Sequence, residues 1–303
     1  MARPTLVVLS ALLFCSLSAC KVSDDAIAAS HQMTSTASTL NDYYSTLEDA
    51  VTETIKLFEL DAAISGIPYG DADRKLQETT RNELENRKQM AADLAELAAS
   101  FAALTKSSAA SDVDKSATAL GNELIHIKAL PGGSPVPDIL GKAGNALMQL
   151  VQQHDEKKAA RAMDETLQAV GDLFEKEKPA YDSIARTHIR QASQVAKDLI
   201  NANDVDFNPM LTPALKPFSL SAVPSSSNLQ AQLKPLALAR LDTATDVATH
   251  KEERASAAML DALREMSSRV HLLATEKPMA IREAPFSLKT VEDWVESWVA
   301  PFI

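Results

Sequence analysis

The sequence predicts an all-α fold, an elongated up-and-down helical bundle with long helices and coiled-coil-like packing. Its 303 residues include only 8 glycines, whereas alanine, leucine, glutamate, lysine and glutamine are abundant, a composition that favours helices. Runs of β-branched residues with the length of a strand are missing from the sequence. Apolar residues instead recur at steps of three and four over long segments, which places them along one face of a helix.

The first long helix is expected to begin near Ser23, because Ser23, Asp24 and Asp25 offer an N-cap and an acidic first turn. Its apolar stripe consists of Leu40, Tyr44, Leu47, Val51, Ile55 and Phe58. The sequence Gly-Ile-Pro-Tyr-Gly at 66–70 predicts a turn. A second helix is expected over about 71–106, with a coiled-coil-like seam made of Met90, Leu94, Leu97, Phe101 and Leu104.

A shorter helix is predicted over about 112–129, and the segment 131–137, rich in proline and glycine, ends it. The helical pattern resumes at 138 and continues to about 178. Pro179 either kinks one long helix or starts the next helix as its first residue, and the helical pattern runs on to about 203.

Residues 204–228 hold four prolines with little periodicity, which predicts a long irregular crossover that is either functional or loosely ordered. The longest helix is expected over about 229–275, with Pro235 in its first turns or at its true start. Helices of similar length joined by tight turns pack antiparallel, hence the up-and-down arrangement.

The C-terminal segment contains both tryptophans and predicts a short helix over 288–300. Its apolar face carries Trp294 and Trp298, and acidic residues occupy the opposite face. This helix either caps the bundle by burying its tryptophans or binds a partner through Trp294, Trp298 and Phe302. Because the acidic face disfavours anionic lipid, a protein is the better partner for the second alternative.

The first 19 residues have the layout of a secretory signal peptide. One positive charge, Arg3, precedes an apolar run from Leu6 to Leu17, and small residues follow. The run is shorter than the roughly 20 residues that a membrane-spanning helix needs. We therefore expect residues 1–19 to be removed and residues 20–303 to form the mature protein.

The signal ends in Leu17-Ser18-Ala19-Cys20, which resembles the lipobox of bacterial lipoproteins. The resemblance implies cleavage after Ala19 and lipid on the Cys20 thiol, and stable anchoring takes two or more acyl chains. The alternative is an ordinary secretory signal in which Cys20 is incidental. Lys21 after the cysteine resembles the pattern of lipoproteins sent to the outer membrane, so we expect the periplasmic face of that membrane.

Composition limits the partners of the mature protein. Without Arg3 it has 29 basic and 41 acidic residues, a net charge of −12, which argues against nucleic acid as a partner. Cys20 would be its only cysteine, so an internal disulfide and a cysteine metal site are both excluded.

Motifs for chemistry are weak. A di-metal site in a helical bundle needs two Glu-x-x-His motifs, and only one occurs, from Glu123 to His126. The segment 136–143 resembles the end of a phosphate loop, but valine stands where the first glycine belongs and alanine replaces the Ser or Thr that binds magnesium. We expect no metal, no cofactor and no catalytic residues.

Together these features predict a lipid-anchored, non-enzymatic protein of the cell envelope that serves as a scaffold, spacer or adaptor for an envelope protein partner. One alternative is a membrane-active or lipid-handling helical protein, suggested by the alanine-rich stretch from Met90 to Leu104. Another is an envelope enzyme or small-ligand binder with a pocket at the 204–228 crossover.

Overall fold

The computed structural model describes the backbone of residues 5–104, 110–136, 138–150, 156–202, 205–215, 227–275 and 286–298. Side chains are described for residues 27–100, 112–136, 138–149, 161–202, 205–212, 231–272, 274–275 and 288–298.

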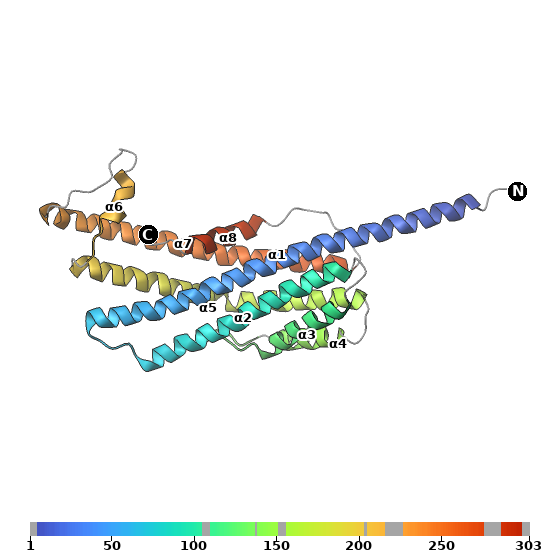
Figure 1. The fold of residues 1–303 in the computed structure, drawn as a ribbon, viewed down its shortest axis with the longest axis horizontal. Coiled ribbons are helices and arrows are strands. Elements are labelled where there is room, and N and C mark those ends of the chain that lie inside the picture. Colours follow the sequence, from blue (N-terminus) through green and yellow to red (C-terminus); the bar gives the residue numbers. More distant parts are fainter. Residues whose placement is uncertain are drawn as a thin grey trace.

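All regular secondary structure in the described residues is helical, which confirms the predicted fold class (Figure 1). The eight helices are α1 (Thr5–Ser65), α2 (Asp71–Leu104), α3 (Ala110–His126), α4 (Asp138–Leu150), α5 (Glu156–Ala202), α6 (Asn208–Leu215), α7 (Ser227–Ala274) and α8 (Phe286–Trp298). The bundle is elongated, and the N-terminal part of α1 extends beyond the other helices at one end (Figure 1).

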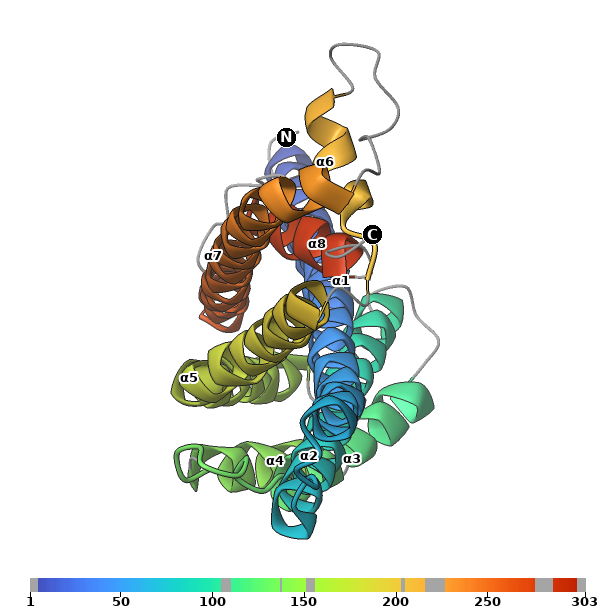
Figure 2. The ribbon, with the colours of Figure 1, turned by 90° about the vertical axis from the view of Figure 1, so that its left-hand side faces the viewer.

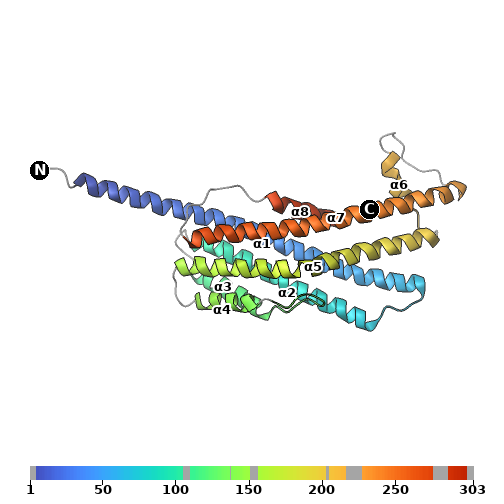
Figure 3. The same cartoon turned by 180° about the vertical axis from the view of Figure 1, so that it is seen from behind.

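Helix α1 organises the bundle, since it packs against α2, α5, α7 and α8. The end view shows α1 near the centre, with α7 and α8 on one side and α3 and α4 on the other (Figure 2). From behind, α5 and α7 run side by side along the molecule (Figure 3). The expected start near Ser23 is wrong, because the helix already runs from Thr5. No glycine or proline occurs between residues 5 and 65 to interrupt it.

The α1–α2 hairpin forms as predicted around the turn at 66–70. Gly66 has a φ of 71°, and its N–H donates to the Ala62 carbonyl at 2.9 Å, which closes the end of α1. In the predicted seam of α2, Met90, Leu94 and Leu97 are buried in the main core. The seam residues Phe101 and Leu104 lie outside the described side chains.

The helical pattern predicted over 138–178 forms as two separate helices, α4 and the first part of α5, which pack against each other. Helix α4 also packs on α3, with Gly144 against Gly121. Leu140, Ala143 and Leu147 are buried in this arrangement. A helix continued straight from α4 into α5 would carry these apolar side chains away from the neighbours that bury them.

Pro179 lies inside α5, so the alternative in which one long helix contains it is confirmed, and Pro235 lies inside α7. The irregular crossover at 204–228 is wrong in part, because it contains α6. Asp206 accepts a hydrogen bond from the Asn208 N–H at 2.9 Å at the start of this helix. Phe207 and Leu211 are buried against α7 and the end of α5, in a second small core.

The main core fills the space between α1, α2, α3, α4, α5, α7 and α8. Its centre is a cluster of aromatic rings made of Tyr43, Tyr44, Phe174, Tyr181 and Trp294. No helix in the part of the chain with described side chains is long and apolar enough to cross a membrane.

Candidate functional site

Cys20, the predicted lipidation site, lies within α1, and its side chain is outside those described. The same helix continues into the bundle, where Ala29 is the first buried apolar residue among the described side chains. Lipid attached at Cys20 would therefore be joined to the core by uninterrupted helical backbone.

The predicted C-terminal helix forms as α8 and packs on α1 and α7. Trp294 is only 3% exposed, and its ring centroid lies 5.2 Å from that of Tyr43. Trp294 thus caps the bundle and has almost no free surface for a partner. Trp298 is half-buried, 5.1 Å from the ring of His188, and Phe302 lies outside the described residues.

The Glu-x-x-His motif on α3 does not assemble a metal site. His126 is exposed, and its Nδ1 lies 2.7 Å from the Asn122 carbonyl of its own helix. Among the described residues, no group of three or more His, Cys, Asp or Glu side chains is placed to hold a metal ion. Asp138 starts α4, so the segment that resembles a phosphate loop is the entry into a helix.

A buried ion pair joins α2 and α5. The Arg87 side chain is fully buried, and its Nε donates to Glu177 Oε2 at 2.7 Å while its Nη2 donates to Glu177 Oε1. Arg87 Nη2 also donates to the Lys128 carbonyl at 2.7 Å, which ties the segment after α3 to this pair. The Tyr181 hydroxyl donates to Glu177 Oε2 at 2.6 Å. Several charge-assisted hydrogen bonds therefore offset the cost of burying both charges.

A second buried acid lies between α5 and α7 without such compensation. Glu252 has no exposed surface, and among the described residues no donor reaches either of its carboxyl oxygens. Burial, and then the negative charge of Asp182, raise the pKa of Glu252 to about 8. Lys178 donates to Asp182 at 2.7 Å. Glu252 therefore holds its proton at neutral pH.

His188 on α5 connects α1 to α8. The Thr54 hydroxyl donates to the Ala50 carbonyl at 2.6 Å, and its oxygen lies within hydrogen-bond distance of His188 Nδ1, at 3.4 Å. Burial lowers the pKa of His188, which favours the neutral ring. The His188 ring also packs against the indole of Trp298 in α8.

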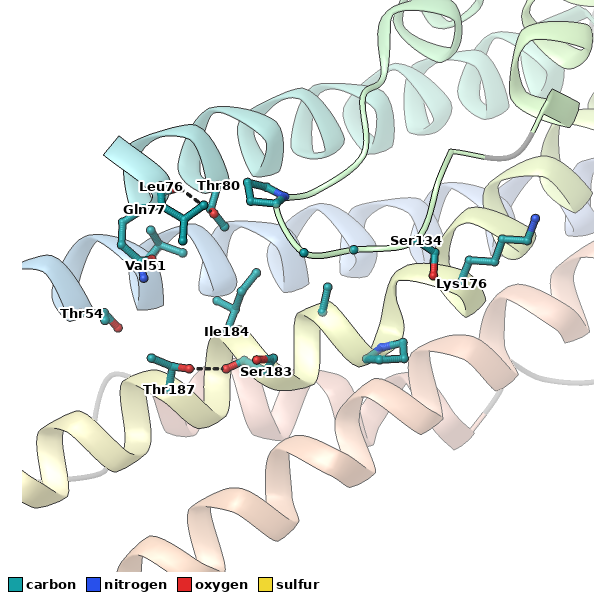
Figure 4. Close-up of a pocket in the computed structure, with 15 residues that line it drawn as sticks. Val51, Thr54, Leu76, Gln77, Thr80, Ser134, Lys176, Ser183, Ile184 and Thr187 are labelled. Atoms are coloured by element: carbon teal, nitrogen blue, oxygen red, sulfur yellow. Dashed lines mark hydrogen bonds between the residues drawn. The ribbon is translucent and has the colours of Figure 1, made fainter. Parts of the chain in front are cut away.

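A cleft with a volume of about 390 Å³ lies between α1, α2, α5 and the segment 131–134 (Figure 4). Its described lining includes one charged side chain, Lys176, and the polar side chains of Thr54, Gln77, Thr80, Ser134, Ser183 and Thr187. Its apolar lining consists of Val51, Leu76, Pro131, Pro179, Ala180 and Ile184. None of the described residues that line this cleft comes from the 204–228 crossover, where the sequence had suggested a pocket.

Sequence reasoning missed the ion pair, Glu252 and the cleft. The sequence does hold a signal for the ion pair and for Glu252, because each of these charged residues lies three positions from an apolar residue of a helical stripe. Arg87 is three residues after Leu84, and Glu177 is three residues after Phe174. Glu252 is three residues before Ala255 on α7. Charged residues at such positions indicate buried polar groups. The cleft has no comparable signal, since four separate segments build it.

Comparison of this chain with protein-family models, curated proteins and solved structures finds no match.

Proposed function

We propose that this protein is a lipid-anchored, non-enzymatic component of the bacterial cell envelope that serves as a scaffold, spacer or adaptor. The observation that carries the proposal is that the lipobox-like sequence ending at Cys20 stands on the same continuous helix, α1, that runs through the bundle core. An anchor in this position holds the bundle by a helix and leaves no flexible linker between lipid and core.

The dimensions of α1 support a spacer. From Cys20 to Ser65 the helix spans about 70 Å, at roughly 1.5 Å per residue. The turn at 66–70 lies at the end of the bundle opposite the N-terminal part of α1 (Figure 1). A protein anchored at Cys20 would present this distal end far from the lipid.

The distal end carries apolar side chains that an adaptor could use. Leu60, Ile64, Ile67 and Leu76 are each at least 41% exposed around the α1–α2 turn. Val205 and Leu236 are also exposed, near the end of α5 and the start of α7. Ile67 is the most exposed of them, at 72%, and Tyr69 of the same turn stacks its ring on that of Phe58 in α1. These residues support a role for this end in contacting an envelope protein.

The alanine-rich stretch that suggested a membrane-active protein has another explanation. Met90, Ala91, Leu94, Leu97 and Ala98 are all buried in the main core. These side chains serve helix packing, so the stretch no longer favours membrane insertion or lipid handling.

Metabolic labelling with palmitate tests the anchor. We expect the wild-type protein to incorporate label and Cys20→Ala to lose it, because the Cys20 thiol is the acylated group. Cys15→Ala is the matched control, since Cys15 is the other cysteine of the chain and lies within the predicted signal. It should label like wild type. Equal labelling of wild type and Cys20→Ala would contradict the proposal, as would loss of label in Cys15→Ala alone.

Fractionation of the envelope tests the location. Since Lys21 follows the cysteine, we propose that the protein resides at the periplasmic face of the outer membrane. We expect it in the outer-membrane fraction, and replacement of Lys21 by Asp should shift it to the inner membrane.

A further inference from the structure

The cleft between α1, α2, α5 and the segment 131–134 presents hydrogen-bond acceptors. Thr80 donates its hydroxyl hydrogen to the Leu76 carbonyl at 2.9 Å, and Thr187 donates to the Ser183 carbonyl at 2.7 Å (Figure 4). A hydroxyl that donates to its own helix keeps its oxygen lone pairs for another donor. Both threonines are therefore placed to accept hydrogen bonds from O–H or N–H groups of a ligand.

Gln77, Ser134 and Ser183 bring amide and hydroxyl groups that both donate and accept. The lining can thus satisfy a molecule that carries many groups able to do both.

The charge of the lining selects a neutral ligand. The chain has 41 acidic residues, yet no Asp or Glu is among the described residues that line the cleft, so a cation finds no counter-charge there. Lys176 is the one charged side chain among them, and it lies beside Ser134, far from Thr54 and Thr187 (Figure 4). An anionic ligand would be disfavoured, because it would face hydrogen-bond acceptors over most of the cleft lining.

The apolar part of the lining complements this pattern. Val51, Leu76 and Ile184 lie close to the threonines in the same cleft (Figure 4). A volume of about 390 Å³ falls at the lower end of the range of small-molecule sites, roughly 300–1,000 Å³. A mono- or disaccharide fits a cleft of this volume, and it alternates apolar C–H faces with hydroxyl groups.

The wall made by the segment 131–134 is held in place. Gly133 N–H donates to the Leu130 carbonyl at 2.8 Å, and Arg87 anchors the carbonyl of Lys128 a few residues earlier. Gly132 adopts a φ of 72°, which glycine reaches without strain. A wall fixed before binding lowers the entropy that a ligand must offset.

From this arrangement we propose that the cleft binds a neutral saccharide, with Thr80 and Thr187 accepting hydrogen bonds from its hydroxyl groups. This site is independent of the lipid anchor.

Titration of the purified full chain with maltose and with N,N′-diacetylchitobiose tests the proposal, in a detergent that has no sugar headgroup. We expect heat of binding by calorimetry and a change in tryptophan fluorescence for at least one of the two sugars. Trp298 reports on the cleft because it contacts His188, which in turn contacts Thr54 in the lining. Inorganic phosphate and tetramethylammonium are the charged controls, and neither should compete.

Isosteric variants test the assigned acceptors. Thr80→Val and Thr187→Val should each weaken sugar binding roughly three- to tenfold, the value of one neutral hydrogen bond. Thr79→Val is the matched control, because Thr79 makes the same bond to its own helix, at 2.8 Å to the Lys75 carbonyl, but is exposed and outside the cleft. Ser183→Trp should abolish binding by filling the space, with helix content by circular dichroism unchanged.

Several outcomes would overturn the saccharide site. No binding of either sugar at millimolar concentrations would do so, as would phosphate or tetramethylammonium binding in their place. Equal sugar affinities of Thr79→Val, Thr80→Val and Thr187→Val would contradict the assignment of Thr80 and Thr187 as acceptors. Cys20→Ala should bind sugar like wild type, so failure of the anchor and failure of this site give different results.

Discussion

The buried charges of this bundle differ in how they are compensated. Arg87 and Glu177 lie against each other with additional hydrogen bonds to each, so neither charge is isolated. Glu252 faces a second acid, Asp182, and avoids an isolated charge only by holding a proton. We expect the buried ion pair to fix the register of α2 against α5, and Glu252 to make the packing of α5 and α7 sensitive to pH.

Replacing Glu252 by Gln should remove this sensitivity. The ordinary pKa of this carboxyl is 4.5, and in the folded protein it is about 8. Between these values the unfolded chain has released the proton and the folded chain has kept it, so the free energy of unfolding falls as the pH rises toward 8. We expect wild type to lose at least about 1 kcal/mol more than Glu252→Gln between about pH 5 and pH 8, measured by urea unfolding.

Titratable residues around Glu252 affect the same measurement. The pKa of Glu252 depends on Asp182, Lys178 and Arg186 of α5, and Tyr43 of α1 interacts with its charge. Both proteins in the comparison therefore retain these four residues. Glu175→Gln is the control, since Glu175 is exposed and pairs with Arg264 at the surface. It should unfold within about 0.5 kcal/mol of wild type at each pH. Parallel pH profiles for wild type and Glu252→Gln would contradict the role of Glu252.

At the scale of elements, the contact between α3 and α4 depends on two glycines. A Cβ atom added at Gly144 would lie 2.6 Å from the Gly121 carbonyl oxygen, and one added at Gly121 would lie 2.9 Å from the Gly144 carbonyl oxygen. Both distances are shorter than a normal contact with backbone atoms, which cannot move aside as a flexible side chain can. The two helices therefore pack at a separation that only glycine allows.

Gly144→Ala should destabilise the protein by roughly 1–3 kcal/mol, because the added methyl group forces α3 and α4 apart. Gly171→Ala is the matched control. Gly171 is also inside a helix, but a Cβ there meets no atom within 4 Å. Since alanine favours helix over glycine, this variant should be more stable than wild type by about 0.5–1 kcal/mol. Thermal unfolding of both variants measures the difference. Equal shifts in Tm for Gly144→Ala and Gly171→Ala would contradict the close packing of α3 and α4.

Two elements were predicted incompletely, and each has a physical reason. No glycine or proline occurs between residues 145 and 170, so neither residue marks a turn between α4 and α5, and the packing of these two helices against each other is visible only in three dimensions. Helix α6 is 8 residues long, too short for a helical period to be read, and burial of Phe207 and Leu211 against α7 stabilises it. The long helices α1, α2 and α7 were predictable, because many turns repeat the same stripe.

At the scale of the whole molecule, charge bears on how an anchored bundle would be oriented. The mature protein would carry a net charge of −12, and an anionic membrane surface repels such a body. A bundle joined to its lipid through uninterrupted helix can lower this repulsion only by standing away from the surface. We therefore expect the turn at 66–70 to be remote from the membrane.

Energy transfer to acceptor-labelled lipid headgroups measures this orientation. With the lipidated protein in vesicles, a fluorophore at Ile67→Cys should show little transfer, because the site is about 70 Å along α1 from Cys20. A fluorophore at Ser35→Cys is the matched comparison, exposed on the same helix but only about 22 Å from Cys20. It should show strong transfer. Similar transfer from both sites would mean that the bundle lies along the membrane.

The sequence by itself determined the helical class, the long antiparallel helices and the lipobox-like motif, because each depends on a local pattern repeated or concentrated within a few turns. Only the tertiary structure decided that α1 continues from Thr5 into the core, that Trp294 is buried against Tyr43, and that α4 and α5 are separate helices packed against each other. It also decided the pairing of Arg87 with Glu177 and the hydroxyl-lined cleft. These features join residues far apart in the chain, and their partners are chosen by packing, about which a local pattern carries no information.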